Sequence, residues 1–238
     1  MLELHSPAKV NLFLKILGKR PDGYHEFASL LQAISLCDTI SFEKTANEKL
    51  TCSEPRLPLN GSNLILKATQ LFRAKTGIRQ HFRVHLNKHI PIEAGLGGGS
   101  SNAATTLWAI NQLCDMPATL DQLIEWGGTL GSDVPFFLSR GTAYCTGRGE
   151  KVRPLPPLSE QTLWIVKPPQ GLSTPQVYRA LDLTQLCLDN PHQALESFIS
   201  GRGTFFNDLE PPALKLDPSL RKLRQSLLDS GFNTVLLS

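Results

Sequence analysis

The sequence predicts an α+β fold with two lobes, because strand and helix patterns occur in mixed order along the 238 residues. A proline-rich segment, Arg153 to Ser159, interrupts these patterns and indicates a boundary between two domains. We therefore expect an N-terminal domain over residues 1–153 and a C-terminal domain over residues 154–238. Hydrophobic residues make up 41% of the chain and charged residues 19%, as in an ordinary globular protein that can bury a core.

The first domain is expected to begin with two strands. Residues 8–17 alternate between apolar and polar positions, and this period of two predicts a half-buried strand. Lys9 and Asn11 share its polar face, where a lysine taken alone is most often solvated. Residues 20–23, Arg-Pro-Asp-Gly, have the composition of a tight turn, and residues 27–44 continue as strand.

The later elements follow from periodicity and from capping residues. In the first domain we expect a helix opening at Asn63, a strand over 81–87, a helix after a glycine-rich loop, a helix over about 119–130, and strands near 141–153. In the second domain we expect a strand over 163–166, helices over 175–183, 192–199 and 217–229, and a strand starting at 233.

The glycine-rich loop is the strongest functional signal in the chain. It begins at Pro91 and carries the consecutive residues Gly95, Leu96, Gly97, Gly98, Gly99, Ser100 and Ser101. Helix-forming residues follow at once, so the loop leads directly onto a helix N-terminus that the serines are expected to cap. Backbone N–H groups without internal partners and the helix dipole favour an anion there, and glycines let a phosphate approach.

The alternative is a flexible surface linker, which most glycine clusters are. We favour polyanion binding because the loop is not part of a low-complexity region and the helix signal is immediate. The loop has no Gly-Lys-Ser/Thr sequence, so it is not a P-loop, and it lacks the glycine spacing of dinucleotide-binding folds. We expect it to be exposed, with few core contacts.

Two further groups could carry chemistry. Asp133 follows Gly131-Ser132 and precedes an apolar run, so it is either a turn-capping residue or a rigidly held general base. Tyr24 and His25 follow the predicted turn and could stack on and hydrogen-bond a nucleobase. They could equally be a tyrosine packed under a loop and a solvated histidine.

Other patterns exclude several classes of protein. His81, His85 and His89 lie on a predicted strand over roughly 25 Å, too far apart to share a metal ion. The net charge is only +3 and no stretch is both basic and rich in aromatic residues, which argues against a nucleic-acid-binding protein. The five cysteines form no C-x-x-C pair, and no segment resembles a signal peptide or a membrane span. We therefore expect reduced thiols and a cytoplasmic location, without membrane association.

Three segments resemble the motifs of a known family, the GHMP kinases. These are residues 6–12 (Ser-Pro-Ala-Lys-Val-Asn-Leu), the loop from Pro91 to Ala103, and residues 131–135 (Gly-Ser-Asp-Val-Pro). Residues 18–25, 171–178 and 206–210 are similar to the members that phosphorylate a cytidine-diphosphate-linked methylerythritol in non-mevalonate isoprenoid biosynthesis. The resemblance implies a ribosomal-S5-like N-terminal lobe and a ferredoxin-like C-terminal lobe.

The resemblance also implies the role of each candidate residue. Asp133 would be the general base and Lys9 the cation that orients the acceptor hydroxyl on C2, while Gly95 to Ser101 and Pro91 would surround the ATP phosphates. Asn63 and Lys88 would lie near the adenosine. Tyr24 and Tyr178 would sandwich the cytosine and His25 would read its polar edge, with Asn11 near the acceptor. Mg²⁺ is expected to accompany ATP, with no protein ligand assigned to it.

One departure from the family pattern concerns the C-terminus. The chain ends at Leu236-Leu237-Ser238, where the family has a third, Gly/Ser-rich motif, so we expect an incomplete C-terminal lobe. Two alternatives follow: another small-molecule kinase of the mevalonate or homoserine type, and an inactive nucleotide-binding paralogue. The expected assembly is a monomer or a weak homodimer.

Overall fold

The computed structural model describes residues 1–139, 141–169, 171–186 and 190–238, which form two compact units interleaved along the chain. The first unit consists of Met1–Lys9, Ala33–Ile92 and Leu96–Gly141. The second consists of Val10–Gln32, Glu93–Gly95 and Thr142–Ser238. The mixed α+β content agrees with the predicted fold class. The division into two consecutive domains at residue 153 stays a prediction.

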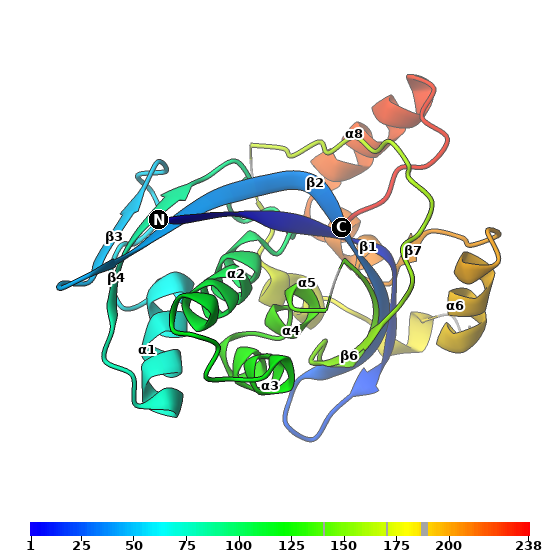
Figure 1. The fold of residues 1–238 in the computed structure, drawn as a ribbon. Helices are drawn as coiled ribbons and strands as arrows, with labels where there is room; N and C mark the ends of the chain where they lie inside the picture. The colour runs from blue at the N-terminus through cyan, green and yellow to red at the C-terminus, as the bar shows by residue number, and fades with distance from the viewer. Residues whose placement is uncertain (140, 170, 187–189) are drawn as a thin grey trace. The chain divides into compact units, whose positions relative to one another are not determined.

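The sheet of the first unit is built from strands distant in the sequence. The strands β1 (Leu2–Lys19) and β2 (His25–Thr45) are long enough to contribute to both units. Within the first unit, β4 (His81–Asn87) pairs antiparallel with residues 39–45 of β2, and β3 (Lys49–Cys52) pairs parallel with β4 (Figure 1). The predicted strand over 81–87 is therefore confirmed.

Four helices pack against these strands around one apolar core. They are α1 (Leu64–Thr76), α2 (Gly98–Leu113), α3 (Leu120–Leu130) and α4 (Val134–Phe137) (Figure 1). Asn63 caps α1 by accepting a hydrogen bond from the Ile65 N–H, and Thr119 and Gln122 form a capping box at α3. The short α4 was not predicted, and it follows Asp133 directly.

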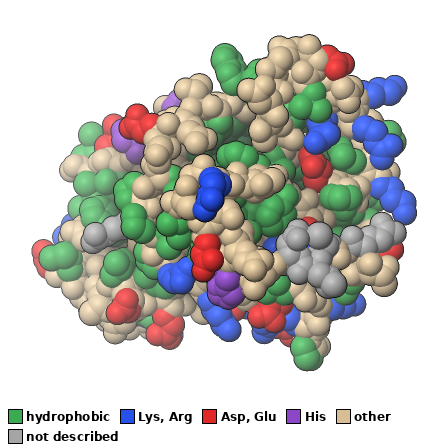
Figure 2. All heavy atoms as spheres, turned by 90° about the vertical axis from the view of Figure 1, so that its right-hand side faces the viewer, with side chains coloured by type: hydrophobic (Ala, Val, Ile, Leu, Met, Phe, Trp, Pro, Cys, Tyr) green, Lys and Arg blue, Asp and Glu red, His purple; other side chains and the backbone are tan. Residues whose placement is uncertain are grey.

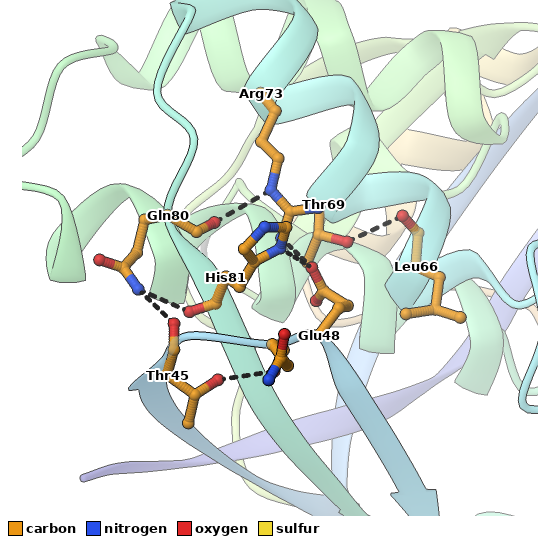
Figure 3. A network of polar contacts seen from close by, with 8 residues as sticks. Thr45, Glu48, Leu66, Thr69, Arg73, Gln80 and His81 are labelled. Atoms are coloured by element: carbon orange, nitrogen blue, oxygen red, sulfur yellow. Dashed lines mark hydrogen bonds and ion pairs between the residues drawn. The ribbon is translucent and has the colours of Figure 1, made fainter.

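A cluster of polar side chains at Glu48 joins α1 to the strands (Figure 3). The Glu48 carboxylate accepts a hydrogen bond from the Arg73 guanidinium, and its Oε2 lies 3.4 Å from Nδ1 of His81. Arg73 also donates from Nε to the Gln80 carbonyl at 3.0 Å. Burial lowers the pKa of Arg73, so the loss of its partner would leave a cation partly removed from water.

We therefore expect Glu48→Gln to lower the free energy of unfolding by about 1–3 kcal/mol, the usual cost when a charged donor that is partly removed from water loses its acceptor. The control is Glu43→Gln, which removes the exposed Glu43–Arg83 ion pair on the neighbouring strand and should cost less than about 0.5 kcal/mol. Urea denaturation of both variants measures the difference. Equal losses would show that the Glu48 cluster is no more than a surface contact.

The second unit has its own strands and helices. The strand β5 (Thr142–Gly147) pairs antiparallel with residues 27–32 of β2 and with β6 (Lys151–Pro154). The two-residue strand β7 (Phe206–Asn207) pairs parallel with β1. The helices are α5 (Thr174–Arg179), α6 (Pro191–Ile199), α7 (Glu210–Leu216) and α8 (Pro218–Asp229), with a 3₁₀ turn at Leu183–Gln185.

Sequence patterns were least reliable in this unit. The predicted strands at 163–166 and from 233 are wrong, because neither segment is a strand in the structure. The apolar run 163–166 is exposed, with Trp164 76% accessible. No strand of the described residues pairs with it, and apolar composition alone cannot make a strand without a neighbour. The helix α7 was not predicted. It contains Pro211 and Pro212 in its first turn, which tolerates proline.

The surface charge, the length of the helices and the state of the cysteines bear on function. In the view of Figure 2, Lys and Arg side chains lie among apolar and acidic ones rather than in one continuous stripe, in keeping with the mild net charge of +3. Among the described helices, none has the length and apolar character that crossing a membrane requires. Among the described cysteines, Cys37, Cys52 and Cys114 are free, and Cys187 lies outside the described residues.

Candidate active site

The glycine-rich loop ends, from Leu96 onward within the first unit, in an uncapped helix N-terminus. Gly97 is the N-cap residue of α2, with a left-handed φ of 68°, and no side chain caps the helix. The first N–H to bond back into the helix is that of Ser101, which donates to the Gly97 carbonyl at 2.9 Å. The prediction that serine caps the helix is therefore wrong. Ser100 lies inside the first turn, and the preceding backbone N–H groups keep no acceptor within the helix.

Lys9 packs directly against this loop. Its backbone N–H donates to the Leu96 carbonyl at 3.0 Å, and the residue is only 7% exposed. A Cβ on Gly97 would lie 3.0 Å from Lys9 Cγ and 2.9 Å from Cζ of Phe137 in α4. The expectation of a solvated lysine is thus wrong, because the loop covers Lys9. The loop is also less exposed than expected, with Leu96 4% accessible.

Asp133 lies beside the same helix terminus. A Cβ on Gly131 would be 3.6 Å from Ser100 Oγ, so the segment that leads to Asp133 is close to the first turn of α2. The next residues, Val134 and Phe136, are fully buried and fix its backbone. Asp133 precedes α4 without capping it, and among the described residues no hydrogen bond or ion pair of its carboxylate is found. This observation does not support the turn-capping alternative, whereas pairing with Lys9 stays a prediction.

Lys88 brings a second cation to the helix terminus. A Cβ on Gly98 would lie 2.8 Å from Lys88 Nζ. The same Nζ is 2.5 Å from Oδ2 of Asp38, which is 0% exposed. Asp38 was not predicted from the sequence, although the alternation of residues along β2 indicates that it is buried. It has the same parity in β2 as the buried Ile40 and Phe42, so it is a carboxylate on the core face of a strand.

The hydroxyl of Ser101 is already used within the protein. Ser101 is 0% exposed, and its Oγ lies 2.8 Å from Oγ of Ser6 in β1. Asn102 donates to Ser6 Oγ at 3.0 Å and to Asp38 Oδ2 at 2.9 Å.

The side chain of Asn63 also has partners within the protein, since it caps α1 and donates to the Pro58 carbonyl at 2.7 Å. Direct contacts of Asn63, exposed Pro91 and Ser101 with ATP stay predictions.

The predicted cytosine-binding residues lie in the second unit. The imidazole of His25 stacks on the ring of Tyr178, with centroids 5.0 Å apart and an interplanar angle of 25°. Burial, with a smaller contribution from nearby Lys19, lowers the pKa of His25 below its ordinary value of 6.5. The ring is therefore neutral at physiological pH and can both donate and accept. Tyr24 is 58% exposed, and the Arg148 guanidinium lies 4.8 Å from its ring centroid.

Asn11 is held firmly in the same unit. It is 6% exposed, its Nδ2 donates to Ser29 Oγ at 2.8 Å, and its backbone N–H donates to Ser238 Oγ at 3.1 Å. Gly95, with φ 71°, also belongs to this unit, and a Cβ there would lie 2.6 Å from the Ser238 carbonyl oxygen. The first unit therefore holds Lys9, Lys88, Asp133 and the helix terminus, while the second holds the aromatic residues and Asn11.

Comparisons with known proteins identify the family of this chain. Residues 63–141 match the family model described as the GHMP kinases N terminal domain. The chain is 53% identical to "4-diphosphocytidyl-2-C-methyl-D-erythritol kinase" from Protochlamydia amoebophila, with 100% of this chain and 81% of the relative covered. It is 47% identical to the chloroplastic protein of that name from Arabidopsis thaliana, and the match covers 97% of this chain and 62% of that relative.

A solved structure gives the same result for the fold. The crystal structure of a 4-(cytidine 5'-diphospho)-2C-methyl-D-erythritol kinase superimposes with a TM-score of 0.80 and 35% sequence identity. The superposition covers 100% of this chain and 86% of that one. The predicted fold class is therefore confirmed.

Proposed function

Because the chain belongs to the GHMP kinases, and within them to the 4-diphosphocytidyl-2-C-methyl-D-erythritol kinases, we propose that it phosphorylates that cytidyl substrate. The γ-phosphoryl group of ATP would pass to the C2 hydroxyl, giving the 2-phosphate and ADP in non-mevalonate isoprenoid biosynthesis. The observation that carries the proposal is the uncapped N-terminus of α2, against which the Lys9 stem and the segment before Asp133 both pack.

ATP would bind through its phosphates at that terminus. The first-turn N–H groups of Gly98, Gly99 and Ser100 supply donors, and Lys88 Nζ lies close to the same turn. Phosphoryl transfer needs little covalent chemistry from the protein, since positioning and charge stabilisation do most of the work. A short list of groups at one helix terminus is therefore sufficient for the ATP side of the reaction.

The acceptor would be activated by Asp133 and Lys9. Asp133 would take the proton of the C2 hydroxyl as the new O–P bond forms and the bond to ADP breaks. Its carboxylate has the freedom this role requires, because no described side chain occupies it. Lys9, held by the loop at its stem, would orient the hydroxyl and balance the negative charge.

We propose that Mg²⁺ arrives with ATP. In kinases this ion keeps several waters and is bound through one or two carboxylates and the substrate phosphates rather than by a protein cage. The described residues contain no group of three His, Cys, Asp or Glu side chains arranged for a metal, so their composition fits that mode. The ion would supply neutralisation of phosphate charge, and no protein ligand is assigned to it.

The quaternary state and the setting are part of the proposal. We propose a monomer or weak homodimer, working in a reducing compartment such as the bacterial cytoplasm, where free cysteines persist. Light scattering at two concentrations tests the first point. The N-terminal GHMP domain would lie within residues 1–153, which include the matched segment, and residues 154–238 would belong to the C-terminal domain.

The experiment that tests the activity is a turnover panel with ATP and three acceptors: the cytidyl substrate, mevalonate and homoserine. A family member that phosphorylates mevalonate or homoserine would also need Lys9, Asp133 and the loop, but it would have no need for the stacked His25 and Tyr178. We expect turnover of the cytidyl compound alone. Phosphorylation of mevalonate or homoserine alone would establish the alternative kinase, and ATP binding without any turnover would establish the inactive paralogue.

A substitution test addresses substrate recognition. We expect Tyr178→Ala and His25→Ala to raise the KM for the cytidyl substrate about tenfold or more, because base stacking contributes roughly 1–3 kcal/mol. The KM for ATP should change little. The matched control is His192→Ala, which removes an imidazole 5.8 Å from another tyrosine ring, Tyr144, and should leave both constants unchanged. A larger effect on ATP than on the cytidyl substrate would mean that the two subsites are reversed.

A further inference from the structure

The carboxylate of Asp38 is fully buried and accepts four hydrogen bonds. Its Oδ1 accepts from the backbone N–H groups of His89 and Ile90, both at 2.8 Å. Its Oδ2 accepts from Lys88 Nζ at 2.5 Å and from Asn102 Nδ2 at 2.9 Å. Such a group is costly to bury unless every acceptor site is used, so its partners are fixed relative to one another.

These partners lie on both sides of the glycine-rich loop. Lys88 to Ile90 immediately precede Pro91, where the loop begins, whereas Asn102 lies just past the first turn of α2, where the loop ends. Asn102 continues the connection to Ser6 in β1, three residues before Lys9. A single carboxylate thus joins the entry to the loop, its exit and the strand that carries Lys9.

Asp38 also explains how a lysine can stand at a helix N-terminus. A cation there is disfavoured, because the helix dipole places partial positive charge at the same end. Lys88 Nζ is close to Gly98, the first residue of α2, and its side chain is only 6% exposed. The negative charge of Asp38 balances this ammonium and fixes its position while the first-turn N–H groups remain available.

We propose that Asp38 is a positioning residue for ATP, acting through Lys88 and Asn102 without touching the nucleotide. The inference rests on the proposed function of the loop as the ATP phosphate site. It predicts a specific pattern in which the affinity for ATP depends on Asp38, while recognition of the cytidyl substrate and turnover at saturation do not.

The test is Asp38→Asn, which keeps the size of the side chain and removes its charge. An amide cannot accept from all four donors, so Lys88 and Asn102 lose their common acceptor. We expect the KM for ATP to rise about 10- to 100-fold, the usual range when a buried charged hydrogen bond is lost. The KM for the cytidyl substrate and kcat at saturating ATP should stay within about threefold of wild type.

The control for a purely structural effect is Asp208→Asn. Asp208 is a largely buried aspartate, its side chain 12% exposed, that pairs with Lys15 at 3.3 Å and accepts a hydrogen bond from the backbone N–H of Ile16 at 2.8 Å. It belongs to the second unit, whereas Lys88 and the loop residues from Leu96 onward belong to the first. Both variants should lower the Tm, but only Asp38→Asn should raise the KM for ATP. Equal KM values for ATP in the two variants would overturn the proposal.

Two further measurements keep the outcome decisive. In a Lys88→Met background, Asp38→Asn should lower ATP affinity less than it does in wild type, because Asp38 is proposed to act mainly through Lys88. Fully additive effects of the two substitutions would contradict the proposal. Should Asp38→Asn not fold, Asn102→Ala replaces it and should raise the KM for ATP several-fold, with an unchanged KM counting against the idea. The ATP-dependent rise in Tm reports affinity without turnover, so the proposal is tested even if the cytidyl activity is absent.

Discussion

Asp133→Asn is expected to bind ATP and the cytidyl substrate normally and to turn over about 10²–10⁴-fold more slowly, the range that a positioned general base contributes. The substitution keeps the size of the side chain and removes its basicity. The fold should be unaffected, because the Asp133 carboxylate does not cap α4 and no hydrogen bond to it is found among the described residues. The measurement is kcat at saturation of both substrates, together with both KM values.

The control for Asp133→Asn is Asp121→Asn. Asp121 is an exposed aspartate in the first turn of α3, so this variant makes the same charge change within the same unit. It should retain wild-type turnover. If Asp133→Asn is also close to wild type, Asp133 is not the base. If instead its KM values rise while kcat is unchanged, the carboxylate contributes to binding rather than to proton transfer.

The parts of the site that sequence predicts well are those carried by one continuous segment. The loop from Pro91 to Ser101 can be recognised from sequence because its glycines and the following helix are adjacent in the chain. Asp133 was identified in the same way, from a turn between a helix and an apolar run. Helices with strong caps, such as α1 after Asn63 and α3 after Thr119, were also placed correctly for local reasons.

The parts that sequence predicts poorly depend on contacts between distant segments. Alternation along β1 suggested that Lys9 faces solvent, because nothing nearby in the chain shows that Gly97 and Phe137 will cover it. Asp38 escaped notice for the same reason, since its four donors come from residues more than 45 positions away. Only the unusual position of a carboxylate on the core face of β2 could have revealed it.

Gly97→Ala is expected to reduce both stability and catalysis, in contrast to the tolerance that an exposed loop would suggest. Gly97 has a left-handed φ of 68°, which costs an L-residue roughly 1–2 kcal/mol. The added methyl would also lie 3.0 Å from Lys9 Cγ and 2.9 Å from Phe137 Cζ, so one of these groups must move. Since a displacement of about 1 Å near the reacting groups can cost about 10²-fold, kcat should fall by that order.

The matched control is Gly77→Ala at the C-cap of α1. Gly77 has nearly the same backbone conformation, φ 74°, yet a methyl there meets nothing within 4 Å. Both variants share the conformational strain, so the difference between them isolates the contact with Lys9 and Phe137. Gly77→Ala should lose stability but keep wild-type kcat and the full rise in Tm that ATP produces in wild type.

Gly97→Ala should melt below Gly77→Ala and lose most of the ATP-dependent rise in Tm, because the new methyl lies where the loop must present its backbone to phosphate. Thermal unfolding with and without ATP, and kcat for both variants, provide the comparison. If Gly97→Ala retains the turnover and the ATP response of Gly77→Ala, the close packing of loop, Lys9 and Phe137 has no catalytic role. The loop would then be a structural connection, and the ATP phosphates would have to bind elsewhere on the chain.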